Sequence, residues 1–337
     1  MRRLAPIVAL VALFPLAQSM SAREANAGEP APTNPPLPAT VVVNANANQP
    51  TNASPATDQV LSHAEDVVDY TMHAELDPVE HLVHGQGTIV WRNDSRVPVH
   101  ELWVHLYLNA FKNEDSLFLS EPVGRFRGGG SVKTWGAIDV RKFEIVDQNA
   151  GADAKTNLWA HAELRHGSSD DETDARVPLP YEIKPGESLT IAMTWDDKLP
   201  SIVERTGFDG SFHMVAQWFP KIAKLEPDGT FVHFPFHRLA EFYSDFGTYD
   251  VTLDAPANFI LGACGPATES HIENGRRIER HIQTDIHDFA WAAWDHFQSV
   301  SADIDGVHVT ALFPPDYDTV VAREMAAMQF SLPHFHA

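Results

Sequence analysis

The stretch 217–251 reads QWFPKIAKLEPDGTFVHFPFHRLAEFYSDFGTYDV and contains nine aromatic residues. Aromatic side chains bury large areas in a β-domain, so core packing accounts for most of them, and the remainder could wall a pocket. Asp228-Gly229 is a strong hairpin-turn signal inside the stretch. The stretch therefore predicts short strands around an aromatic core.

Strand-like segments continue on both sides of this stretch. Turn pairs such as Asn274-Gly275 and Asp305-Gly306 separate several of them. Many short strands with little helix predict an all-β sandwich or barrel-like domain, which we place at residues 60–314. The segments with strand character are 67–74, 87–91, 101–108, 137–146, 188–195, 214–223, 248–253, 259–263, 277–282, 290–294 and 307–313.

One helical pattern follows the predicted strands, in residues 315–337. Val321, Met325 and Met328 recur at helical spacing after Asp318, a suitable N-cap. Pro333 is expected to end or kink this helix. The sequence offers no sheet of its own for the helix, so we expect its apolar face to be uncovered. The segment then reads as the first helix of a truncated second domain, and its deletion is expected to leave thermal stability nearly unchanged.

The amino terminus has the features of an export signal. A basic start and an apolar run from Leu4 to Ala17 predict a signal peptide over residues 1–27, cleaved before Gly28 or, alternatively, after Ala17-Gln18-Ser19. The apolar run is too short to span a bilayer. Residues 28–59 are rich in Pro, Ala and Asn, which predicts a disordered tether. We therefore expect a secreted or periplasmic protein without a transmembrane segment.

Composition excludes one class of partner and one source of stability. The chain has 46 acidic and 24 basic residues and a formal net charge of -22, so repulsion from phosphate makes nucleic acid an unlikely ligand. Apolar residues make up 44% of the 337 positions, enough for a sizeable core. Cys264 is the single cysteine, so no internal disulfide forms, and its apolar neighbours indicate a small buried side chain.

The 18 histidines do not give a metal site by their spacing. His161 and His166 are five apart, which separates their side chains on a helix and on a strand. His233 and His237 are four apart, but Pro235 between them argues against a helix, so hydrogen-bonded or solvent-facing rings are favoured. We take the pair in His334-Phe335-His336 as a frayed end. The residues themselves predict neither a metal ligand nor a catalytic group.

Several motifs together resemble the amino-terminal β-domain of the membrane alanyl aminopeptidase family, which are gluzincin zinc metallopeptidases. The resemblance extends from about Tyr70 to Phe313. The motifs, in the order of the chain, are LDP at 76–78, GQGTIVW at 85–91, ELWVHLYLNAF at 101–111, QWFPK at 217–221, HFPFH at 233–237, EFYSDFGTYDV at 241–251 and HDFAW at 287–291.

The resemblance implies a saddle-shaped β-sandwich that packs, in the family, on a thermolysin-like catalytic domain. A loop of the β-domain supplies a Gln or Glu that binds the free amino terminus of a peptide substrate, and Gln217 is the nearest candidate. The family's zinc-binding His-Glu-x-x-His has no counterpart here. The resemblance therefore implies part of a zinc aminopeptidase, and we expect this chain to hold no zinc and to be inactive alone. The alternative is a non-catalytic secreted module that binds peptide or glycan.

Overall fold

The computed structural model describes residues 11–12, 42–44, 67–121, 132–146, 156–165, 171–201, 204–240 and 242–336. The chain divides into two compact units, Leu61–Asp295 and a second unit that combines Met1–Val60 with His296–Ala337. Of the predicted signal peptide and tether, only Val11–Ala12 and Val42–Asn44 lie within the described residues.

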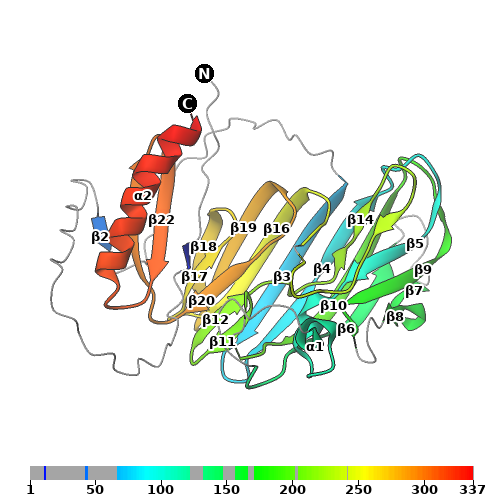
Figure 1. Ribbon diagram of the computed structural model, residues 1–337, viewed down its shortest axis with the longest axis horizontal. Helices are drawn as coiled ribbons and strands as arrows, with labels where there is room; N and C mark the ends of the chain where they lie inside the picture. Colours follow the sequence, from blue (N-terminus) through cyan, green and yellow to red (C-terminus); the bar gives the residue numbers. More distant parts are fainter. Residues whose placement is uncertain are drawn as a thin grey trace. The chain divides into compact units, whose positions relative to one another are not determined.

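The larger unit is built on a long sheet whose strands lie side by side in Figure 1. Within the described residues, eight strands follow one another in the order β18, β19, β16, β3, β4, β10, β6 and β7. All neighbours are antiparallel except β3 and β16, which are parallel. The strands are β3 (Val68–Asp77), β4 (Leu82–Arg92), β6 (Ala137–Ile145), β7 (Thr156–Asn157), β10 (Ser188–Lys198), β16 (Gly247–Pro256), β18 (Ala267–Glu273) and β19 (Arg276–Ile286).

Alternating burial shows why this sheet has one core face. Every second residue of β16 is buried, beginning with Gly247, and the central part of β10 follows the same period. Successive side chains of a strand point to opposite faces, so the buried set shares one face of the sheet. The parallel pair is also joined by a side chain, because the Thr248 N–H donates to the Asp69 carboxylate at 3.2 Å, 179 positions away in the chain.

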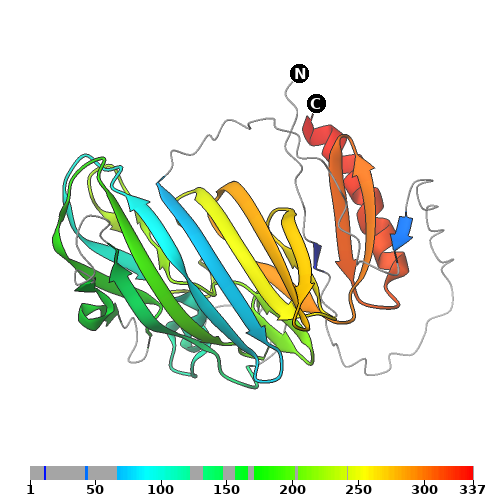
Figure 2. The same ribbon diagram turned by 180° about the vertical axis from the view of Figure 1, so that it is seen from behind.

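Smaller sheets and short helices form the other layer of the sandwich, visible from both sides in Figures 1 and 2. One sheet has the order β13, β5, β9, β8, another the order β11, β12, β20, β17, and β14 pairs with β15. Their bounds are β5 (Val99–His105), β8 (Glu163–Arg165), β9 (Asp174–Ile183), β11 (Gly207–Asp209), β12 (Phe212–Val215), β13 (Lys221–Ile222), β14 (Lys224–Leu225), β15 (Phe231–Val232), β17 (Ile260–Ala263) and β20 (Trp291–Trp294). The short helices are η1 (Tyr107–Phe111), α1 (Leu117–Ser120) and η2 (Trp159–His161).

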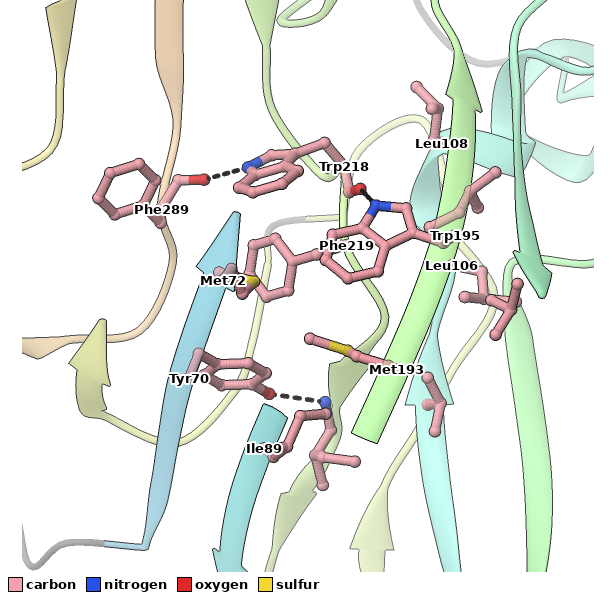
Figure 3. Close-up of a cluster of buried hydrophobic side chains, with 14 of the residues drawn as sticks. Tyr70, Met72, Ile89, Leu106, Leu108, Met193, Trp195, Trp218, Phe219 and Phe289 are labelled. Carbon is pink, nitrogen blue, oxygen red and sulfur yellow. Dashed lines mark hydrogen bonds between the residues drawn. The ribbon is translucent and has the colours of Figure 1, made fainter. Parts of the chain in front are cut away.

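The core between the layers is aromatic and contains satisfied polar groups, as Figure 3 shows. The Tyr70 hydroxyl of β3 accepts a hydrogen bond from the Ile222 N–H at 2.9 Å. The Trp195 indole of β10 donates to the Trp218 carbonyl, and the Trp218 indole donates to the Phe289 carbonyl at 2.8 Å. Because buried polar groups need partners, these bonds fix how segment 217–219 lies against the large sheet.

One glycine of the predicted hairpin motif has a clear packing reason. Gly85 of β4 lies directly opposite Trp195 of β10. A Cβ atom at position 85 would overlap the Trp195 indole, so the glycine provides the space in which the fully buried ring lies. Glycine in a strand often marks such a close approach.

The smaller unit joins a hairpin to the long helix. β21 (Gln298–Ile304) and β22 (Val307–Phe313) are antiparallel, and β2 (Val42–Asn44) and β1 (Val11–Ala12) pair with their outer edges. On α2 (Asp318–His336), Val321 and Met325 are buried in a cluster that also contains the apolar residues of β21 and β22.

The sequence therefore predicted correctly which face of α2 is apolar, but it predicted wrongly what this face contacts. The expectation that this face has no sheet to pack on is wrong, because β21, which the sequence did not indicate, completes a sheet beneath it. The compact units divide between Asp295 and His296, whereas the sequence-based boundary lies at 314/315. α2 continues through Pro333 to His336, so His334-Phe335-His336 belongs to the helix and is not a frayed end.

The fold class predicted from the sequence is confirmed, since the chain forms an all-β sandwich followed by a helix. The segment 214–223 differs from the prediction of one strand: it contributes the end of β12 and the whole of β13, separated by a turn at Gln217. Among the described helices, none is long and apolar enough to cross a membrane.

Candidate functional site

The pocket that contains Gln217 lies in the larger unit, and its space is small. About 30 Å³ is open to a water-sized group, which is room for about one or two groups of the size of a water molecule or an ammonium ion. The pocket is lined by Phe111, Phe118, Glu204, Arg205, Thr206, Ala216, Gln217, Phe236, Arg238, Ala240 and Phe242. A terminal charged group of a ligand fits in this space.

Four phenylalanines form a continuous wall of the pocket. Phe236 is the centre of this wall, with ring centroids 4.9 Å from Phe118 and 5.3 Å from Phe242. Phe111 meets Phe118 edge to face at 5.3 Å. Aromatic faces attract cations, and two arginines already use them. The Arg205 guanidinium lies 5.2 Å from the Phe242 centroid and that of Arg238 lies 5.9 Å from Phe118.

Gln217 reaches the pocket from a tight turn between β12 and β13. Its backbone φ is 58°, in the left-handed region that non-glycine residues seldom adopt. Such conformations persist where the surrounding structure enforces them. Trp218 provides the restraint, because its carbonyl and its indole N–H are both hydrogen-bonded to the core. The Gln217 side chain is 6% exposed, so it is a buried polar group that needs partners.

Asp288 is the partner of the Gln217 side chain. The Gln217 Nε2 donates to Asp288 Oδ2, and the same oxygen lies 2.7 Å from the Lys221 ammonium. Lys221 is buried, and desolvation holds its pKa below the ordinary lysine value even though the carboxylate opposes this shift. Gln217, Asp288 and Lys221 thus form one network, in which Gln217 and Lys221 are buried and Asp288 is partly buried.

His233 and His237 each form a pair with a carboxylate. His233 Nδ1 lies 2.8 Å from Asp174 Oδ2 and its ring stacks on Trp103, while His237 Nδ1 lies 2.6 Å from Glu121 Oε1. Of the two arrangements expected for this pair, hydrogen-bonded or solvent-facing, the hydrogen-bonded one is observed. His166, the second member of the other pair, lies outside the described residues.

Zinc does not fit the donor sets of the described residues. No group of three His, Cys, Asp or Glu side chains with metal-binding geometry occurs in the part of the chain that the structure describes. Structural and catalytic zinc sites need three or four such ligands. We therefore assign no chemistry to a metal here.

The structure adds residues that sequence reasoning missed. The aromatic stretch packs largely as predicted, with Trp218, Phe219 and Tyr249 in the core and Phe236 and Phe242 at the pocket. Glu204, Arg205 and Arg238 were not identified as pocket residues. Asp288 and Lys221 belong to the motifs HDFAW and QWFPK, but the sequence analysis gave them no role. They are 67 positions apart (288 − 221), and no spacing rule links residues at that separation. Cys264 is only partly buried, and burial raises the pKa of its thiol.

Proteins similar to this chain are found among solved structures. No family model and no curated protein matches the chain. Among solved structures, the M1 zinc metallopeptidase from Deinococcus radiodurans aligns with 75% of this chain and 48% of its own, at 15% identity and a TM-score of 0.41. A mutant of that protein bound to a Tyr-Ser-Ala substrate aligns with 74% of this chain and 48% of its own, at 15% identity and a TM-score of 0.44. The chain spans about half the length of the solved structures it matches.

Proposed function

We propose that Leu61–Asp295 is the amino-terminal β-domain of a secreted, zinc-aminopeptidase-like protein, and that Gln217 receives the free amino group of a peptide in its pocket. The observation that carries the proposal is a buried polar side chain in an ammonium-sized space with a wall of aromatic rings. An amide oxygen accepts hydrogen bonds from an ammonium group. The motif resemblance supports the same role for this residue.

The proposal gives binding, and not hydrolysis, to this chain. Removal of an amino-terminal residue in the family needs zinc ligands and a general base, and the described residues supply no such set. The intact protein would then join this β-domain to a catalytic domain that cleaves the peptide. The chain alone holds the amino terminus and leaves the peptide uncut.

The test compares one tripeptide in free and amino-terminally acetylated form. Calorimetric titration of the full chain should show about tenfold or tighter binding of the free form, the usual contribution of a hydrogen bond to a charged group. Gln217→Leu keeps the volume but removes the acceptor, so it should abolish the difference. Gln86→Leu, at an exposed position of β4, should preserve it. Equal binding of both peptides by the unmodified chain contradicts the proposal.

A second candidate function follows from the arginines of the same pocket. Arg205 and Arg238 line the space, and guanidinium groups bind carboxylates well. The chain would then be a non-catalytic secreted module that holds the carboxylate end of a peptide. Amidation of the tripeptide's carboxyl terminus distinguishes the two, because it weakens binding only in this second case.

A further inference from the structure

Asp288 is surrounded by donors that fix the orientation of its carboxylate. Its Oδ1 accepts a hydrogen bond from the Phe289 N–H at 2.8 Å. Its Oδ2 faces the Lys221 ammonium and the Gln217 side-chain nitrogen. An ionised carboxylate has no proton to donate. Both oxygens are therefore acceptors with assigned donors.

This arrangement removes the usual ambiguity of a glutamine amide. The oxygen and nitrogen of such an amide are nearly the same size, so either end can face a neutral partner. Facing Asp288, only the nitrogen of Gln217 makes a hydrogen bond, while the oxygen would meet a negative charge. The Gln217 Oε1 consequently points away from Asp288, and within the described residues it receives no hydrogen bond.

The backbones on both sides of this contact are tied together as well. The Trp218 indole donates to the Phe289 carbonyl at 2.8 Å (Figure 3). Trp218 follows Gln217 in the chain and Phe289 follows Asp288, so this bond is next to the Gln217–Asp288 bond. Two neighbouring residues of one segment are thus bound to two neighbouring residues of the other. If the Gln217 amide rotated by 180°, it would lose its hydrogen bond to Asp288. The neighbouring Trp218–Phe289 bond keeps the two segments in the position in which this bond forms.

We propose that Asp288 is a positioning residue for the pocket: it holds the Gln217 amide with its oxygen toward the space, so that this side chain offers an acceptor to the donor groups of a ligand. This inference rests on the proposed amine-binding role of Gln217 and adds the group that sets its selectivity. Lys221 balances the charge of Asp288 from a buried position. Removing one member of a buried ion pair leaves an uncompensated charge, so the two residues must be changed with care.

Two variants separate the acceptor at position 288 from its charge. Asp288→Asn keeps one oxygen, which the Lys221 ammonium attracts to its own side, where Gln217 also lies. It gives up the countercharge of Lys221 and the acceptor of the Phe289 N–H, so its urea midpoint is measured beside the affinities. The double variant Lys221→Met with Asp288→Leu has neither an acceptor nor an unpaired charge. The ratio of affinities for the free and the acetylated tripeptide should stay within about threefold of the original in Asp288→Asn and fall about tenfold or more in the double variant. A general loss of structure would lower both affinities and leave no such pattern.

A ratio preserved in the double variant overturns the inference, because the amide would then be oriented without Asp288. A ratio lost equally in both variants also overturns it, because the acceptor is retained in one of them. The side-chain amide resonances of Gln217, assigned from the Gln217→Leu spectrum, provide a readout without peptide. We expect them to show a hydrogen-bonded N–H in the original chain and in Asp288→Asn, and to lose it in the double variant. If the original chain binds both peptides equally, the proposed function fails, while these resonances still decide the orientation.

Discussion

His105 is a titratable side chain in the interior of the sandwich. It is 2% exposed in β5, its Nδ1 is 4.0 Å from Asp174 Oδ1, and its ring lies 4.6 Å from that of Tyr107. Burial, together with the positive charges of Lys221 and His233, lowers the pKa of His105 to about 3. The folded protein therefore holds this ring neutral where an unfolded chain would protonate it.

The buried His105 should lower the free energy of unfolding as the pH falls below the pKa of an ordinary histidine. A histidine of the unfolded chain binds a proton near pH 6.5, whereas the folded His105 stays neutral. The contribution of the neutral His105 ring to the free energy of unfolding is therefore complete above pH 6.5 and is lost progressively toward pH 3. The slope reaches at most about 1.4 kcal/mol per pH unit for one group. His105→Phe should flatten the pH dependence of urea unfolding between pH 7.5 and 5.5. All eight tryptophans lie between Trp91 and Trp294, so their fluorescence reports the larger unit.

His100, exposed on the same strand, is the matched control for this titration. His100→Gln should leave the pH dependence unchanged. The same slope in His105→Phe and in the original chain would show that other groups govern acid unfolding.

Gly85→Ala tests the packing of the Trp195 indole. The added methyl would overlap the ring, and Trp195 cannot move without stretching its hydrogen bond to the Trp218 carbonyl. Overpacking of this kind costs about 1–3 kcal/mol, which should appear as a lower urea midpoint. Gln86→Ala, at the exposed neighbouring position, should change the midpoint little. An unchanged midpoint in Gly85→Ala would mean that the ring has room to shift.

The helix α2 now has a different expected role from the one its sequence implied. Met325 of α2 is 2% exposed and packs in one cluster with the β21–β22 hairpin. Phe330 of the same helix is 80% exposed. Met325→Ala should destabilise the smaller unit by about 2–5 kcal/mol, because it leaves a cavity beneath the helix. Phe330→Ala should have a much smaller effect. Hydrogen exchange of the β21 and β22 amides measures both, since it reports this unit apart from the sandwich.

Strands with regular alternation could be read from the sequence, and strands without it could not. β16 and β10 were found because every second residue is apolar. β9 was missed because Pro178 and Pro180 interrupt it, and the register shift in its pairing with β5 falls beside Pro178. β18 was missed because all seven of its residues are exposed. A strand that is stabilised mainly by pairing with its neighbours need not show an apolar alternation, so its sequence alone does not reveal it.

The same limit applies to the site. Gln217 was chosen by its position in a motif, and its left-handed turn before Trp218 was not foreseen. Its partner Asp288 lies 71 positions away, and only the folded sandwich brings the two together. Charged residues at such separations have no periodicity to reveal them.

At the scale of the whole molecule, we expect the purified mature chain to bind no zinc stoichiometrically and to cleave no aminoacyl reporter. The ring nitrogens of His233 and His237 that face carboxylates are already hydrogen-bonded, and the described residues offer no three-ligand group. Metal analysis after dialysis, together with a peptidase assay, checks both statements. One tightly held zinc per chain, with turnover abolished by a chelator, would overturn them.

The parallel pairing of β3 with β16 also governs when the large sheet can be completed during synthesis. β3 is made early and finds β4 at once, but its other edge waits for a strand whose Thr248 lies 179 positions beyond Asp69. Until then the edge exposes unpaired backbone groups, and contacts of such long range form slowly. A nascent chain of this design stays unfinished through most of its translation. This delay makes the unpaired edge of β3 the place where a holding chaperone has most to protect.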